Sequence, residues 1–447
     1  MKKLFIISLA LLAMTSCTQQ KSNEKAALAG DSAVIADTMV TIKLDELTDF
    51  KLVKSLSPAE QDKKMKEVYN LSSITDNVEY IVLGSKNDKG EEEYIKKALQ
   101  VIVGKEYIFV NTMDRGLLFQ RDGKFIRKIG RLGQGPKEYS YVEDMDIDET
   151  AGRIYVKSGG KLVAYSFDGE YIKSMSFHDV PFFAMLNDTL FAASFDNSYG
   201  NAPYRLILQN EKKDTIKAFP NFVKFKSLKP GETIALYSNN NQRFYRYNGN
   251  VYYREAYNDT VFRISSNNEL VPTYYLDWGK RAMTTEKRPE YLVDRKRIGE
   301  ECLHLFRTQI LETEHYLFMP SFSYNTGIGG PGATSGFYVY DKQLQTRVVI
   351  YPPYDIKHRR IPNSMSGFIM RGYQNNIDGG LPFFPEGVSS DGYIYNYVLA
   401  ADFKDVLDAV GYYEEDVIAE KQQKLKELVK SLDEYSDNMV LMMVKPK

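Results

Sequence analysis

Cysteine and histidine are scarce in this sequence. Only two cysteines, Cys17 and Cys302, and four histidines occur among 447 residues. None of the histidines has the His-x-His or His-Glu-x-x-His spacing that preforms a zinc site, so a metal-dependent hydrolase is not expected. We expect no metal and no other cofactor, and a fold stabilised by its apolar core instead of by internal disulfides.

The chain also lacks an excess of charge of either sign. Lys and Arg total 58 against 59 for Asp and Glu, which gives a formal net charge of −1. No basic block is present that could follow a phosphate backbone, so nucleic acid is not expected as a partner. The composition is 43% hydrophobic and 13% aromatic, which is enough for a large core.

Long hydrophobic runs are absent except at the N-terminus, where Leu4 to Ala13 follow Lys2 and Lys3. Ten residues reach only about 15 Å as a helix, roughly half of the hydrocarbon thickness of a bilayer. The run therefore predicts a signal peptide over residues 1–16. The sequence Met14-Thr15-Ser16-Cys17 resembles a bacterial lipobox, with Met14 in place of the usual Leu.

We expect Cys17 to be lipidated and to anchor the mature chain to the lipid bilayer. The alternative is an ordinary signal peptide with an incidental cysteine. Residues 17–70 are expected to form a flexible tether, because Thr18 to about Val40 is polar and offers too little apolar surface to fold. Ser57-Pro58-Ala59-Glu60 predicts a short helix within it.

An internal repeat of 46 residues organises the body of the chain, residues 71–447. Ile108-Phe109-Val110 and Ile154-Tyr155-Val156 are each followed, at equal offsets, by an Asp-Gly pair, Asp122-Gly123 and Asp168-Gly169. Asp-Gly favours a tight hairpin turn, so each copy predicts two adjacent antiparallel strands. A repeat of this length built from short strands is typical of propeller blades. Weaker copies begin at Val251 and at Asp391.

The C-terminal region has a different amino-acid composition. Residues 412–432 are rich in Glu, Lys and Gln, with leucines at helical spacing, and predict one amphipathic helix. We expect its apolar stripe to pack on the propeller; the alternative is a helix that binds a partner. The run Met439–Val444 predicts a strand without a polar face, which must be buried on both sides and which we expect to close the ring.

Together these segments resemble the six-bladed β-propeller lipoproteins of Gram-negative gut-type bacteria, which are similar in architecture to NHL-repeat propellers. The resemblance covers about residues 71–447. It is carried by residues 78–83, 123–126, 133–139, 258–264 and 439–447. It implies an all-β fold of six blades, with five or seven as alternatives, at the outer membrane on its periplasmic face or at the cell surface. It carries over no catalytic residue.

Two motifs are better explained by structure than by chemistry. The run Gly130–Pro136 looks like a phosphate loop but lacks Gly-Lys-Ser/Thr, so it predicts a crossover between blades. Asp144, Asp146 and Asp148 imitate a calcium loop, but Glu149 occupies the required glycine position. Their alternation predicts the wet face of a strand instead. A Gly-x-Ser-x-Gly nucleophile motif is absent.

The expected function is non-catalytic binding of a glycan, a peptide or a partner protein of the cell envelope. The alternative is a polysaccharide hydrolase or lyase acting from the central funnel, since catalytic carboxylates from different blades leave no local motif. Binding is expected on projecting irregular loops within 321–336 and 371–387. The candidate ligand-binding residues are Tyr324, Asn325, Arg371, Tyr373 and Asp378.

Overall fold

The computed structural model describes most of the chain from residue 70 onward, together with a short segment before it. The described residues are 39–44, 70–178, 180–197, 199–225, 244–255, 258–293, 309–324, 333–350, 372–414, 416–433 and 436–447. The expected signal peptide, Cys17, Cys302 and the helix expected near Ser57 lie outside these residues.

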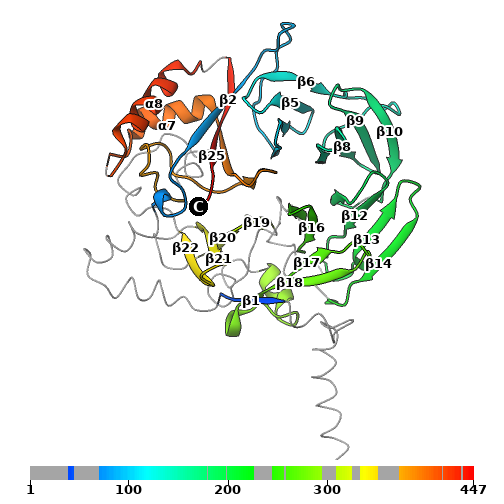
Figure 1. The fold of residues 1–447 in the computed structure, drawn as a ribbon. Helices are drawn as coiled ribbons and strands as arrows, with labels where there is room; N and C mark the ends of the chain where they lie inside the picture. The colour runs from blue at the N-terminus through cyan, green and yellow to red at the C-terminus, as the bar shows by residue number, and fades with distance from the viewer. Residues whose placement is uncertain are drawn as a thin grey trace, which may run out of the picture.

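Six β-sheets are arranged in a ring, which is a six-bladed β-propeller (Figure 1). Each blade has four antiparallel strands, ordered from the inside of the ring outward. The strands of blade 1 are β3 (Gln100–Val103), β4 (Tyr107–Asn111), β5 (Gly116–Gln120) and β6 (Phe125–Ile129). Those of blade 2 are β7 (Asp144–Asp148), β8 (Arg153–Ser158), β9 (Lys161–Ser166) and β10 (Tyr171–Ser176). Those of blade 3 are β11 (Phe182–Met185), β12 (Leu190–Ser194), β13 (Tyr204–Asn210) and β14 (Thr215–Pro220).

The other three blades follow the same plan. The strands of blade 4 are β15 (Phe244–Tyr247), β16 (Asn250–Tyr253), β17 (Thr260–Ile264) and β18 (Leu270–Asp277). Those of blade 5 are β19 (Leu311–Glu312), β20 (Tyr316–Tyr324), β21 (Ala333–Asp341) and β22 (Thr346–Ile350). Those of blade 6 are β23 (Gly387–Val388), β24 (Ile394–Leu399), β25 (Asp437–Val444) and β2 (Glu79–Gly84).

The predicted repeat coincides with the second, third and fourth strands of blades 1 and 2. The Asp122-Gly123 and Asp168-Gly169 pairs form the turns before β6 and β10, as predicted. Gly123 has a φ of +94°, and a Cβ added there would collide with the carbonyl oxygen of Val82 in β2. Only glycine therefore fits at this turn, where blade 1 packs against blade 6.

The core is divided among the six spaces between neighbouring blades, and each space holds one cluster of buried apolar side chains. Strand β25 contributes to two of them. Val440, Met442 and Val444 pack toward blade 5, whereas Met439 and Leu441 pack toward blade 1. A strand buried on both faces needs apolar residues at every position, which explains why this run has no polar face.

Strand β25 closes the ring. It pairs with β24 on one side and with β2 on the other, so the last strand of the chain joins the first strand of the body. Ile81 pairs with Leu441, and Tyr397 pairs with Leu441 from the other side. The predicted closure is confirmed.

Two helices occupy the connection between β24 and β25 and cover one side of the ring (Figure 1). Helix α7 (Ala400–Val410) was not expected, and α8 (Ala419–Ser431) begins seven residues later than predicted. Leu425 and Val429 of α8 pack into the cluster between blades 5 and 6, so docking on the propeller is confirmed. The described residues also form the 3-10 helices η1 (Leu71–Ser73) and η2 (Gly279–Arg281) and the short α4 (Arg288–Val293).

A strand from the expected tether adds to blade 4. Strand β1 (Val40–Lys43) pairs in parallel with β18, and the N–H of Leu44 donates to the carbonyl of Asp277. The side chains of Ile42 and Leu44 are buried between blades 4 and 5 beside Trp278. The expectation of a tether throughout 17–70 is therefore wrong for residues 40–44, because their apolar side chains fill a gap in the core.

Replacing Ile42 with Ala is expected to lower the free energy of unfolding by about 2 kcal/mol, because it opens a cavity at a side chain that is 1% exposed. Urea denaturation of the mature chain measures the change. Val40→Ala is the matched control, since Val40 belongs to the same strand but is 40% exposed. Equal stability of the Ile42→Ala variant and the parent would contradict the docking of β1.

Candidate functional site

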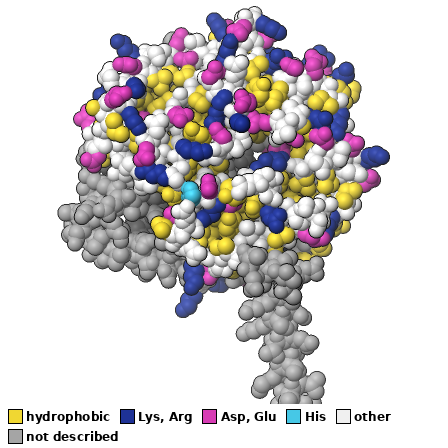
Figure 2. All heavy atoms as spheres, viewed as in Figure 1, with side chains coloured by type: hydrophobic (Ala, Val, Ile, Leu, Met, Phe, Trp, Pro, Cys, Tyr) yellow, Lys and Arg dark blue, Asp and Glu magenta, His cyan; other side chains and the backbone are white. Residues whose placement is uncertain are grey.

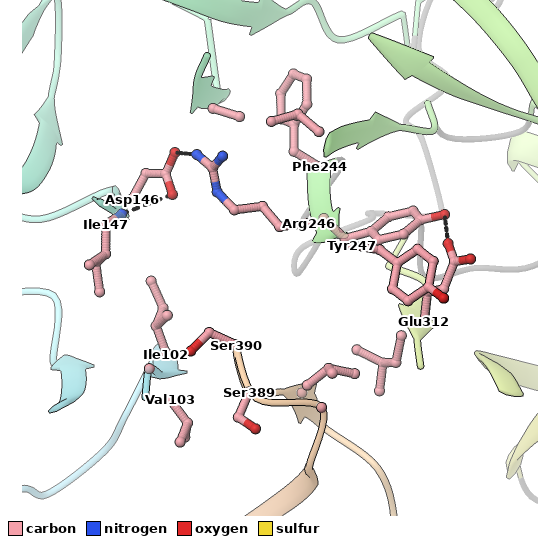
Figure 3. Close-up of a pocket in the computed structure, with 18 of the residues that line it drawn as sticks. Ile102, Val103, Asp146, Ile147, Phe244, Arg246, Tyr247, Glu312, Ser389 and Ser390 are labelled. Carbon is pink, nitrogen blue, oxygen red and sulfur yellow. Dashed lines mark hydrogen bonds and ion pairs between the residues drawn. The ribbon is translucent and has the colours of Figure 1, made fainter. Parts of the chain in front are cut away.

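The centre of the ring contains a cavity of about 810 Å³. It is lined by the innermost strand of every blade and by the turn that follows each of these strands. These turns therefore lie at one end of the ring, which we call the hairpin end. Figure 2 shows acidic and basic side chains gathered around the central hollow, and Figure 3 shows side chains of several blades converging on the cavity.

An ion pair spans blade 3 at the wall of this cavity. Asp146 of β7 in blade 2 accepts a hydrogen bond from Arg246 of β15 in blade 4 (Figure 3). Asp146 also accepts the N–H of Met185 at 2.7 Å, and Arg246 donates to the carbonyl of Met185 at 2.8 Å. Burial alone would lower the pKa of Arg246, but the Asp146 carboxylate raises it above its ordinary value. The two side chains thus bond the backbone of Met185 in β11, the innermost strand of blade 3, whose inner edge has no partner strand.

The side-chain amide of Gln100 bonds the free inner edge of blade 2 in the same way. Gln100 of β3 accepts the N–H of Met145 and donates to its carbonyl, both at 3.1 Å. Innermost strands have one edge without a partner strand, and an unpaired edge is costly and prone to wrong pairing. Side chains from neighbouring blades therefore complete the hydrogen bonds of the cavity wall.

Asp144 lies on the same face of β7 as Asp146. Burial raises the pKa of Asp144 to about 7, and the neighbouring Asp146 carboxylate adds to this rise. The strand predicted for the three aspartates is confirmed as β7. Their side chains are only partly exposed, because they face the cavity instead of bulk solvent.

The raised pKa of Asp144 makes stability depend on pH. An unfolded Asp titrates near pH 3.9, so the folded state binds the proton more tightly and is destabilised as pH rises from about 4 to about 7. Asp144→Asn mimics the protonated acid. Its gain in unfolding free energy over the parent is expected to grow by about 1 to 3 kcal/mol between pH 5 and pH 8. Chemical denaturation at both pH values measures it, and a gain independent of pH would contradict the titration.

A second buried carboxylate ties blade 4 to blade 5. Glu312 of β19 accepts the hydroxyls of Tyr245 at 2.8 Å and Tyr274 at 2.7 Å, and the ammonium group of Lys342 at 3.1 Å. Burial raises the pKa of both tyrosines, and the Glu312 charge raises it further. The Lys342 ammonium group also lies 4.3 Å from the centre of the Tyr247 ring, a cation–π contact.

The rim of the hairpin end is polar as well. Glu149 accepts the backbone N–H of Lys105 at 2.8 Å and the hydroxyl of Ser390 at 3.1 Å, which links blades 2, 1 and 6. Arg121 approaches Asp391 at 3.5 Å. Apolar side chains lie between these groups, among them Ile102, Ile147 and Phe244 (Figure 3). The cavity thus combines fixed donors and acceptors with apolar walls, as ligand sites do.

The described part of the chain contains no group of three or more His, Cys, Asp or Glu side chains that could hold a metal ion. Its helices also include none that is long and apolar enough to cross a membrane.

A family model for a domain of unknown function, DUF4934, matches residues 56–445. The chain belongs to this family. No curated protein matches it. Among solved structures, a protein of Bacteroides fragilis NCTC 9343 described as a "Putative exported protein" has a TM-score of 0.62 at 16% identity, covering 92% of this chain and 100% of its own. At that identity the likeness shows the propeller fold alone.

Two further structures are more distant. Streptogramin B lyase has a TM-score of 0.35 at 11% identity and covers 74% of this chain and 93% of its own. A protein of unknown function from Bacteroides caccae has a TM-score of 0.33 at 12% identity and covers 59% of this chain and 90% of its own. At these TM-scores neither structure carries an argument about function.

The five ligand-binding candidates have different positions in the structure, and two of them lie outside the described residues. Tyr324 ends strand β20, whereas Asn325 and Arg371 lie outside the described residues. Tyr373 and Asp378 are 2% and 3% exposed, and Asp378 accepts hydrogen bonds from Tyr80, Asn375 and the N–H of Gly380. The expectation that these two project from the surface is wrong, because their segment packs into the core between blades 5 and 6. Ligand binding by the candidates stays a prediction.

The irregular loop expected over 321–336 is also different in the structure. Its two ends continue strands β20 and β21, which pair from Tyr316 with Asp341 to Tyr324 with Ala333. Local sequence signals do not indicate Arg246, Glu312 or Gln100, because each has partners from another blade. The alternation of Asp144, Asp146 and Asp148 predicted a polar strand face, and the structure places this face at the cavity wall.

Proposed function

We propose that this protein is an exported, membrane-anchored binding module that takes a polar ligand into the central cavity without turnover. The observation that supports it is the cavity itself, with about 810 Å³ of space and polar side chains from different blades. Cavities of about 300–1,000 Å³ with a few fixed polar groups are typical of small-ligand sites. A glycan segment or a short peptide fits this description, and either class can be presented by the cell envelope.

Three carboxylates that line the cavity are held by other groups of the protein, which favours binding over catalysis at these residues. Asp146 is held by Arg246, Glu312 by two tyrosines and Lys342, and Glu149 by backbone N–H groups. Groups fixed in this way can orient the hydroxyl or amide groups of a ligand at little entropic cost. A general acid or base, in contrast, must be able to exchange a proton with substrate.

A ligand screen tests this proposal. The mature chain is applied to glycan and peptide arrays, and each hit is measured by calorimetry with the parent, Arg246→Ala and Arg127→Ala. Arg127 is the matched control because it lies on the outer strand β6, away from the cavity. A change of affinity in Arg246→Ala but not in Arg127→Ala supports a site in the cavity, because only Arg246 lines it.

Other outcomes overturn parts of the proposal. If Arg246→Ala binds as well as the parent while Tyr324→Ala does not, the ligand is held by the loop that follows β20. If the parent releases products from a polysaccharide over multiple turnovers, the protein is an enzyme. If no array component binds, the cavity is not a ligand site of these classes.

Membrane attachment is proposed to occur through Cys17. The mature protein is expected to partition into detergent, and Cys17→Ser is expected to release it or to block its processing, because acyl chains contribute about 0.8 kcal/mol per buried CH₂ group. Intact-mass measurement of the purified protein checks the modification. A mature mass without acyl chains, or a free thiol at residue 17, would contradict the anchor.

A further inference from the structure

The charge of the cavity is unlike that of the rest of the chain. Its lining includes seven carboxylates but only two side chains with a permanent positive charge, Arg246 and Lys445. The whole chain is nearly balanced, with a formal net charge of −1. The negative charge is therefore concentrated at the axis of the ring. Blade 2 alone supplies four of the carboxylates: Asp144, Asp146, Asp148 and Glu149.

Only part of this charge is neutralised by the protein. Asp146 pairs with Arg246, Glu312 pairs with Lys342, and Asp391 pairs with Arg121. Among the described residues, the other four carboxylates of the lining form no ion pair. Walls of low dielectric constant concentrate the field of such charges inside a cavity. An anionic ligand would be repelled, and it would have to displace Asp146 to reach the cation of Arg246.

We propose that the ligand of the cavity carries protonated aliphatic amines. This inference rests on the proposed function: the cavity defines the site, and the carboxylates select the charge of what enters it. Alternate residues of a strand are spaced by about 6.6 Å, so Asp144, Asp146 and Asp148 form a row of separated acidic groups along the wall. Asp146 is paired with Arg246, and Asp144, whose pKa is raised to about 7, is only partly ionised at pH 7. Glu314 adds a carboxylate from blade 5. A row of this kind matches an extended cation with several amines better than a single compact one.

The apolar part of the lining fits the same class. Phe244, Ile102 and Ile147 offer surface to the carbon skeleton between amines, whether this skeleton is a methylene chain or a sugar ring (Figure 3). Tyr247, which lines the cavity, already has one ammonium group over its ring, that of Lys342. Two sources of the shared chemistry remain to be distinguished, an oligosaccharide of amino sugars and a linear polyamine.

Calorimetry with matched probes tests the inference. The mature chain is titrated at pH 7 with the trimers of glucosamine, N-acetylglucosamine and galacturonic acid, which share a sugar skeleton but differ in charge, and with spermine. The glucosamine trimer or spermine is expected to bind at least about tenfold more tightly than the neutral and acidic trimers. This preference should weaken in 0.5 M salt, because added ions shorten the distance over which charges interact. This screening length falls to about 3 Å at 1 M salt. Whichever of the two binds identifies the source.

The double variant Asp148→Asn and Glu314→Gln is expected to lower the affinity for the amine by about tenfold, which is 1.4 kcal/mol. Asp122→Asn is the matched control, because Asp122 accepts a backbone N–H in a hairpin turn, as Asp148 does, but does not line the cavity. Equal or tighter binding of a neutral or acidic trimer overturns the charge inference while leaving the binding function intact. Binding of trilysine but of neither the glucosamine trimer nor spermine keeps the charge inference and assigns the amines to a basic peptide. If no compound of this panel and no array component binds, both the charge inference and the proposed binding function are wrong.

Discussion

A chain that ends at Ser436 is expected to be unfolded. This truncation removes β25, whose residues Met439 to Val444 are at most 1% exposed. Burial of one large apolar side chain contributes about 1.5 to 3 kcal/mol. Six of them therefore match or exceed the net stability of a typical domain, about 5 to 15 kcal/mol. The loss would also leave β2 and β24 with unpaired edges in the middle of blade 6.

Far-ultraviolet circular dichroism and thermal melting of the truncated chain measure this effect. Leu441→Ala is a milder variant that should still fold but lose about 2 to 5 kcal/mol of unfolding free energy. Ile216→Ala is its control, because Ile216 lies on a strand but is 51% exposed, and a change within about 0.5 kcal/mol is expected. A truncated chain with a cooperative melt near that of the parent would show that the ring does not need β25.

Removal of the Glu312 carboxylate is expected to have the second largest effect. Glu312 is 2% exposed and bonds two tyrosine hydroxyls and one ammonium group. Glu312→Ala leaves these three donors without their acceptor and the Lys342 charge without its partner. Breaking a buried ion pair by removal of one member costs about 3 to 5 kcal/mol, and urea denaturation is expected to show a loss of that size.

Two further variants distinguish the loss of a buried, paired carboxylate from the loss of any acidic side chain. Glu420→Ala removes the same group from the exposed Glu420–Lys424 pair of α8 and should change stability by less than about 0.5 kcal/mol. Glu312→Gln combined with Lys342→Met removes both charges and should recover part of the loss, because no unpaired ion remains. If Glu312→Ala is no more damaging than Glu420→Ala, the Glu312 contacts do not hold blades 4 and 5 together.

The sequence predicted the parts of the fold that depend on local signals. The Asp122-Gly123 and Asp168-Gly169 turns fix two hairpins, and their equal offsets predict the blades. The run Met439–Val444 predicts a strand buried on both faces, because it has no polar residue. Such signals arise from neighbours in the sequence, so the chain alone reports them.

The cavity could not be predicted in this way. Asp146 and Arg246 are 100 residues apart in the sequence, and the propeller brings them together across a whole blade. Strand β1 was missed although Val40, Ile42 and Leu44 alternate with Thr41 and Lys43, because so short an alternation indicates a strand only together with the gap in the core that Ile42 and Leu44 fill. Tyr373 and Asp378 looked like surface residues of a glycine-rich loop, yet this loop fills the space between blades 5 and 6.

The sharing of blade 6 between the two ends of the body also determines the order of folding. Strand β2 (Glu79–Gly84) is synthesised early, whereas its partner β25 (Asp437–Val444) is synthesised long afterwards. Contacts between residues so distant in sequence form slowly, because the chain between them must first be ordered. The ring therefore stays open until β25 has been synthesised. A ribosome that stops between Leu399 and Met439 releases a chain in which β2 and β24 both lack their partner strand, a natural target for proteolysis.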